Sequence, residues 1–370
     1  MNARCCIVLL IIFASCRVII DGETQPVSQP THAAESLPEK TFEVFWQTFE
    51  DHYAFFDIRG VDWHKTYDTF RPMVNGRTSD DSLFNILCAM VKPLQDDHVE
   101  IYYIKKRSYQ EFTASKSSPF LHEFPGANGL KNFWRMVDHT LIENGFHQPV
   151  DFGPKENGIP LFTFSASASA GYIRFTRCNV SGETQNDQAK DAMRAGKLLD
   201  SILMKLGPKE KIILDIRANE GGFDEFAYAI ASRFADTTHI GHYEQKRNGG
   251  YVDFTPLVPY YIKPQGVQHL KPVFILTNDQ SASAADVFAM IMNALPNTTL
   301  VGEHTTGIFS DMFGFMLPNG WLASLSNERY FSHDMKCYES LGVPVDIEIK
   351  NTRKDLVTKR DPVLEKALEL

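Results

Sequence analysis

Residues 272–295 read PVFILTNDQSASAADVFAMIMNAL. The run 273–277 has the composition of a strand buried on both faces, and the apolar residues after the SASA letters recur at helical spacing. The stretch therefore predicts a strand, a tight turn and a helix that begins next to Ser283. A serine there is a common helix N-cap. It also stands at the carboxyl edge of the sheet, where α/β proteins bind ligands and where a nucleophile would meet helix N–H donors.

The same four letters occur at 165–168, in FSASASAGYI. This copy leads directly into a predicted strand, and no helix follows that could supply N–H donors. We interpret it as a small-residue approach to the strand. Of the two copies, only the one containing Ser283 is a candidate active site.

Strand–helix alternation extends outward from this stretch. Residues 211–217, KIILDIR, predict a buried strand, and 223–235 predict the helix after it. Further strands are predicted at 171–178, 298–303 and 345–349, helices at 187–207 and 361–370, and a hairpin at 314–326. This alternation indicates the α/β class, with a largely parallel sheet flanked by helices.

The loop between the predicted strand 211–217 and the predicted helix 223–235 reads ANEGG and ends in Gly221 and Gly222. Paired glycines leave backbone N–H groups open to a ligand. One of them could form an oxyanion hole together with the N–H of Ala284. The alternative is a simple turn between strand and helix.

The preceding part of the chain has a different pattern, with aromatic residues at helical spacing in 41–56. We divide the chain into an export signal (1–20), a linker (21–38), a helical domain (39–98), a connecting segment (99–169) and the α/β core (170–370). The connecting segment is assigned only a strand at 99–104 and a helix at 130–145.

The first residues, MNARCCIVLLIIFASCRVII, place one arginine before a short apolar run and then small residues. This order is typical of an export signal and is too short for a membrane span; the alternative is a buried N-terminal helix. FASC resembles a bacterial lipobox with Cys16 as the lipidated residue, although Phe13 is unusual there. The expected location is therefore periplasmic, extracellular or membrane-anchored through Cys16.

Composition excludes several classes of protein. The formal net charge is −9 and no Lys/Arg cluster occurs, which argues against a nucleic-acid partner. Beyond the signal, Cys88, Cys178 and Cys337 are too few and too scattered for a metal spacing or a disulfide framework, and at most one bridge could form. No dinucleotide or nucleotide fingerprint is present, so neither a cofactor nor a metal is expected.

Several ordered motifs resemble the C-terminal processing (tail-specific) serine peptidases, specifically their tricorn-core branch. The motifs are LDIRANEGG (214–222), LTNDQSASAADVFA (276–289), LVGEHTTG (300–307), YESLGVPVDIEI (338–349) and, in the helical part, FWQTFEDHYAFFDIRGVDW (45–63) with LQDDHV (94–99). The resemblance implies a ClpP/crotonase-like core and hydrolysis of peptide bonds in peptide or protein substrates.

Two departures from the processing branch direct the choice of base. Ile308 stands where that branch has its catalytic lysine, and 105–169 show no PDZ signature. The resemblance to the tricorn-like branch instead implies His98 as the general base and points to Glu339, which could orient the imidazole directly or through Asp97. A serine hydroxyl needs such a base, and histidine suits the task near neutral pH. His304 is the competing candidate.

A second hypothesis belongs to a different class of protein. The same fold occurs in non-catalytic lipid-binding modules of interphotoreceptor retinoid-binding type, in which an apolar pocket replaces the triad. The missing lysine and Val345 before Asp346, where the family has Pro-Asp, keep this hypothesis open. A serine-reactive probe would separate the two.

Overall fold

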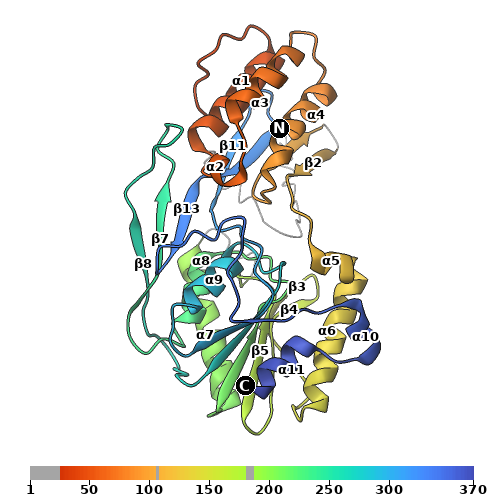
Figure 1. The fold of residues 1–370 in the computed structure, drawn as a ribbon, viewed down its shortest axis with the longest axis vertical. Helices are drawn as coiled ribbons and strands as arrows, with labels where there is room; N and C mark the ends of the chain where they lie inside the picture. Colours follow the sequence, from red (N-terminus) through yellow and green to blue (C-terminus); the bar gives the residue numbers. More distant parts are fainter. Residues whose placement is uncertain (1–25, 106–107, 181–186) are drawn as a thin grey trace, which may run out of the picture.

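The computed structural model describes residues 26–105, 108–180 and 187–370 (Figure 1). The export signal and Cys16 lie outside these residues, so the predictions made for them stay predictions. No helix in the described ranges is long and apolar enough to cross a membrane.

Helices dominate the N-terminal part, where aromatic side chains form the core. The helices are α1 (Leu37–His52), α2 (Phe56–Arg59), α3 (Trp63–Phe70) and α4 (Asp80–Val91), with short 3-10 turns at Arg71–Met73 and Lys92–Leu94. Acceptor side chains at the N-caps of α3 and α4, Asp62 and Ser79, bond the first helical turns. Among the fully buried side chains are Phe42, Phe45 and Phe49 of α1.

These helices pack on a four-stranded antiparallel sheet in the order β11-β12-β1-β2. Its strands are β1 (Glu100–Ile104), β2 (Tyr109–Thr113), β11 (Met312–Met316) and β12 (Leu322–Ser326). β11 and β12 are the predicted hairpin. Because Ile101 pairs with Ala323, the hairpin from the C-terminal half fixes the start of β1 in space.

The second part is a mixed α/β core with a parallel-rich sheet, as predicted. Its seven strands run in the order β14-β10-β9-β6-β5-β4-β3. Pairing is parallel from β14 to β5 and antiparallel for β4 and β3. The strands are β3 (Val150–Glu156), β4 (Ile159–Ala166), β5 (Ala170–Phe175), β6 (Lys211–Asp215), β9 (Val273–Thr277), β10 (Thr298–Gly302) and β14 (Ile347–Glu348).

Helices cover both faces of this sheet (Figure 1). One face carries α7 (Gln188–Leu206), α8 (Asp224–Ala231) and α9 (Ala284–Met292). The other carries α5 (Pro119–Glu123), α6 (Gly126–Glu143), α10 (Arg353–Thr358) and α11 (Pro362–Glu369). The connecting segment 99–169 thus supplies β1 and β2 to one sheet, β3 and β4 to the other, and the covering helices α5 and α6. The earlier SASA copy forms the end of β4 and the turn into β5.

A third, three-stranded sheet stands beside the core in the order β13-β7-β8. It consists of β7 (His239–Lys246), β8 (Val258–Ile262) and β13 (Glu328–Ser332). β13 continues directly from the hairpin strand β12. Because β6, β9 and β10 are parallel neighbours in the seven-stranded sheet, their carboxyl ends lie at the same edge of that sheet.

Candidate active site

Ser283 lies in a tight turn at the carboxyl end of β9, directly before α9. Its backbone has φ 57° and ψ −125°, an arrangement that residues other than glycine rarely adopt. Strain of this kind concentrates at functional sites, and a strained strand-to-helix turn is how α/β hydrolases present a nucleophilic serine. The side chain is half-buried, so it remains accessible at the edge of the sheet.

A buried carboxylate, Asp286, holds this turn in place. Its Oδ2 accepts hydrogen bonds from the N–H of Ser283 at 3.0 Å and of Ile308 at 3.1 Å, and its Oδ1 accepts one from Gly307 at 2.9 Å. Burial raises the pKa of Asp286 to about 7, although these hydrogen bonds oppose the shift. Asp286 was missed in the sequence, where the pattern of an N-cap serine followed three residues later by an acidic residue was the available signal.

The glycine loop after β6 touches the serine turn. A Cβ atom built on Gly221 would lie 2.7 Å from the Cβ of Ser283 and 2.9 Å from the N of Ala284, so only glycine fits there. The Gly221 N–H donates to Asn219 Oδ1 at 2.9 Å and is therefore already engaged. Gly222 is exposed, and its close approach to the Cys178 carbonyl leaves no room for a side chain either. Of the two glycines, Gly222 is thus the better candidate donor.

His98 lies two residues before the start of β1 and is 1% exposed. Asp96 Oδ1 accepts from its backbone N–H at 3.0 Å, and the Ser324 hydroxyl donates to its carbonyl at 2.8 Å. Both ring nitrogens are buried and have no hydrogen-bond partner among the described residues. Burial lowers the pKa of His98, while the charges of Asp96 and Asp97 oppose the shift, so the ring is neutral at pH 7.

Glu339 is buried but does not hydrogen-bond the imidazole. Its Oε1 pairs with the Arg59 guanidinium at 2.5 Å, and its Oε2 accepts from the Phe309 N–H at 3.0 Å. Burial raises the pKa of Glu339 to about 8, and Arg59 opposes the shift. Arg59 was missed in the sequence because it lies 280 positions from its partner.

The relay expected from Glu339 through Asp97 to His98 is therefore not formed in this structure. Burial raises the pKa of Asp97, while the nearby Ser115 side chain and Lys116 backbone oppose the shift, and Asp97 Oδ1 has no hydrogen-bond partner in the described part of the chain. Asp96 instead lies inside the buried network, where it also accepts from the Tyr53 hydroxyl at 3.0 Å.

A four-residue segment, 307–310, connects these groups. The N–H groups of Gly307 and Ile308 bond Asp286, and the N–H of Phe309 bonds Glu339. The backbone of Ser310 lies close enough to the His98 ring to raise its pKa. Two extended residues span at most about 7 Å, so the segment brings the serine turn and the histidine to one edge of the sheet. His304, the competing base, is exposed and lies outside these contacts.

Sequence comparison agrees with this geometry. The profile of peptidase family S41 matches residues 169–349, and the profile of the tricorn protease C1 domain matches residues 38–92. The α/β core of the chain is thus similar to peptidase family S41. The match to family S41 covers every strand end that forms the candidate site. The match to the tricorn protease C1 domain ends six residues before His98.

Three similar proteins illustrate this likeness. It is 30% identical over 201 residues to the carboxy-terminal processing protease CtpA of Bacillus subtilis (strain 168), covering 54% of this chain and only 40% of that protein. A structure from Parabacteroides merdae ATCC 43184, provisionally named a peptidase, is 26% identical with a TM-score of 0.72 and coverage of 90% and 96% of the two chains. The photosystem II D1 C-terminal processing protease shares the fold, at 14% identity, a TM-score of 0.51 and coverage of 85% and 94%.

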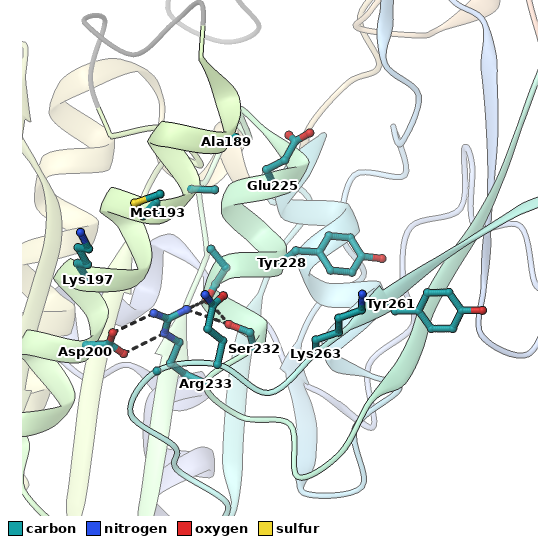
Figure 2. Close-up of a pocket in the computed structure, with 14 residues that line it drawn as sticks. Ala189, Met193, Lys197, Asp200, Glu225, Tyr228, Ser232, Arg233, Tyr261 and Lys263 are labelled. Atoms are coloured by element: carbon teal, nitrogen blue, oxygen red, sulfur yellow. Dashed lines mark hydrogen bonds and ion pairs between the residues drawn. The ribbon is translucent and has the colours of Figure 1, made fainter.

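A separate cavity of about 610 Å³ lies between α7, α8 and the end of β8 (Figure 2). Its lining includes the ion pair of Asp200 with Arg233, but none of Ser283, His98 and Glu339. Glu225, the second residue of α8, stands at the end of this cavity farthest from that ion pair in Figure 2. The cavity is therefore distinct from the candidate active site.

Proposed function

We propose that this chain is a serine peptidase of the S41 type, in which Ser283 is the nucleophile and His98 the general base. The observation that carries the proposal is the strained turn of Ser283, packed against Gly221 at the carboxyl edge of the sheet. A histidine kept neutral by burial is ready to accept the serine proton as the hydroxyl attacks the substrate carbonyl. Export of the chain belongs to the same proposal and rests on the pattern of residues 1–20 alone.

The expected steps follow from the positions of these groups. The Ser283 Oγ bonds to the carbonyl carbon, its proton passes to His98, and the negative charge collects on the carbonyl oxygen. The N–H groups of Gly222 and Ala284 are the proposed donors to that oxygen. His98 then protonates the leaving amine, and water hydrolyses the acyl-enzyme by the same route in reverse. Arg59 and Glu339 act as positioning residues because they hold the 309–310 backbone beside the imidazole.

The substrate class is part of the proposal. The Bacillus subtilis relative is named for carboxy-terminal processing, and we extend cleavage of peptide bonds in a peptide or protein to this chain. Incubation of the purified protein with a fluorophosphonate probe tests the proposal, with covalent labelling of a serine as the expected result. Retention of an apolar ligand without labelling would support the non-catalytic binding alternative.

Gly221→Ala is expected to lower kcat by about two to three orders of magnitude, because the new methyl group must displace the serine turn and the Ala284 N–H. Gly158→Ala is the matched control. Gly158 also has positive φ, 81° against 91° for Gly221, but has nothing within 4 Å of the added Cβ. Both variants should lose stability through backbone strain, whereas only Gly221→Ala should lose turnover. Equal kcat in the two variants would show that the glycine loop is not part of the site.

Asp286→Asn should reduce both stability and turnover. The amide nitrogen of asparagine cannot accept the hydrogen bond that the replaced carboxylate oxygen accepted. The backbone N–H group left without a partner should lower the free energy of unfolding by about 1–3 kcal/mol. Asp355→Asn is the matched control, since Asp355 accepts from the Thr352 N–H at the start of α10 in the same way. Denaturant unfolding should show a loss in both variants, and peptide hydrolysis should show a loss in kcat only for Asp286→Asn. Wild-type kcat in a folded Asp286→Asn protein would contradict this positioning role.

A further inference from the structure

A group of carboxylates lies beside the proposed catalytic centre. Asp224 follows the exposed glycine of the loop by two residues, and Asp311 directly follows Ser310. Glu244 of β7 and Glu328 of β13 lie behind them and are buried. The Tyr330 hydroxyl is 3.1 Å from Asp224 Oδ2 and 3.4 Å from Glu328 Oε2, which fixes the separation of these two side chains.

Hydrogen bonds connect this acidic group to the environment of His98. The N–H of Glu328 donates to Ser310 Oγ at 3.0 Å, and that hydroxyl donates to the Asp311 carbonyl at 2.7 Å. The Ser310 backbone is the part of the chain next to the imidazole. Asp311 is therefore one residue removed from the contact with the proposed base.

The acidic group is only partly neutralised. Lys246 contacts Glu244 at 3.4 Å and also pairs with Glu328, so the inner two carboxylates share one ammonium group. Asp224 and Asp311 form no ion pair within the described residues. Asp311 is exposed and Asp224 is half-buried, so both can be reached from solvent. Burial and the neighbouring charges of Asp311 and Glu225 raise the pKa of Asp224 well above its usual value.

An unfilled hydrogen-bonding position adjoins the same group. The His242 side chain is 2% exposed and stacks between Tyr260 and Tyr330, with ring centroids 4.7 and 4.6 Å away. Its Nδ1 is 2.6 Å from the Tyr228 hydroxyl. Its Nε2 points toward Glu244 Oε2 at 4.0 Å, too far for a hydrogen bond, and has no other partner in the described part of the chain. A buried polar atom of this kind, at the Glu244 side of the acidic group, is a position that a polar ligand group can satisfy.

We propose that Asp311 and Asp224 form a subsite for a lysine or arginine side chain of the peptide substrate, next to the scissile bond. The proposal rests on the proposed peptidase function and adds the substrate class. Lys246 shows how this surface holds an ammonium group, and the outer carboxylates offer the same chemistry to an incoming cation. A metal ion is the less suitable occupant, because no three His, Cys, Asp or Glu side chains in residues 26–105, 108–180 and 187–370 are arranged to hold one.

The test compares peptides that differ at one position, lysine against norleucine, at each of the three residues on either side of the scissile bond. Norleucine keeps the apolar stem and removes the charge. At one of these positions, the kcat/KM of the wild-type protein should be at least about tenfold higher for the lysine peptide than for the norleucine peptide. Asp311→Asn should bring that ratio close to one, and Asp311→Lys should reverse the preference toward glutamate. Asp334→Asn is the control, because this exposed acid pairs with Lys336 outside the acidic group and should leave the ratio unchanged.

Binding measurements separate this proposal from the proposed function. The Ser283→Ala protein should bind the lysine peptide about tenfold more tightly than the norleucine peptide, whether or not the wild type cleaves either. Absence of turnover with this difference intact would overturn the peptidase assignment and support the subsite. Equal affinities at all six positions, or a lysine preference that survives in folded Asp311→Asn and Asp224→Asn proteins, would overturn the subsite.

Discussion

Ser283→Ala is expected to lower kcat for peptide hydrolysis by about four to six orders of magnitude, the scale on which removal of a triad serine acts. The methyl group cannot attack the carbonyl, and the remaining N–H donors stabilise only the uncatalysed attack of water. The fold should be unaffected, because the turn is held by the backbone bond from the Ser283 N–H to Asp286, which alanine keeps. Steady-state kinetics and circular dichroism of the purified variant measure both effects.

The earlier SASA copy offers a control with the same chemical change. Ser167 accepts from the Ala170 N–H at 3.0 Å in the turn between β4 and β5, so Ser167→Ala should cost a little stability and leave kcat at the wild-type level. Wild-type turnover by a folded Ser283→Ala protein would show that another residue is the nucleophile.

His98→Ala should lose nearly as much activity as Ser283→Ala, because the members of a catalytic unit act together. Without a base, the serine hydroxyl stays protonated and is a weak nucleophile. His304→Ala removes an exposed imidazole from the same edge of the sheet and is the matched control. A folded His98→Ala protein with full turnover, together with an inactive His304→Ala protein, would move the base to His304.

The pH profile gives an independent check on the base. Burial lowers the pKa of His98 from its ordinary value of 6.5, so the imidazole stays neutral throughout the range from pH 6.5 to 8. Wild-type kcat/KM should therefore be flat with respect to this group above pH 6.5 and fall at lower pH, as protonation removes the acceptor for the serine proton. Loss of activity on raising the pH from 6.5 to 7.5 would contradict a neutral histidine base.

Local patterns were sufficient to predict the parts of the site that are built locally. The strand, turn and helix around Ser283, and the glycine loop after β6, follow from hydrophobic runs and turn residues that are neighbours in the sequence. Asp286 has a local signature as well, yet an acidic residue three positions after an N-cap is common enough that it suggested only a helix start. The roles assigned to Ser283, His98 and the loop glycines remain predictions until the variants are measured.

Long-range contacts account for what the sequence did not show. Arg59 meets Glu339 only because α2 packs near the C-terminal part, and nothing close to either residue in the chain indicates the pair. The start of β1 is fixed by pairing with β12, again across more than half of the chain. β3 is an outer strand with exposed and half-buried residues, so its apolar pattern was too weak to assign.

The central claim is that Ser283 and His98 act as one unit, and the rate of covalent labelling of Ser283 by a fluorophosphonate tests it most directly. The rate should be measured between pH 5 and 8 in the wild-type and His98→Ala proteins, with the modified peptide identified by mass spectrometry. We expect labelling at Ser283 that falls below pH 6.5 in the wild type, and labelling in His98→Ala that is at least about a thousandfold slower and independent of pH over this range. Equal rates in the two proteins, or an adduct on a serine other than Ser283, would contradict it.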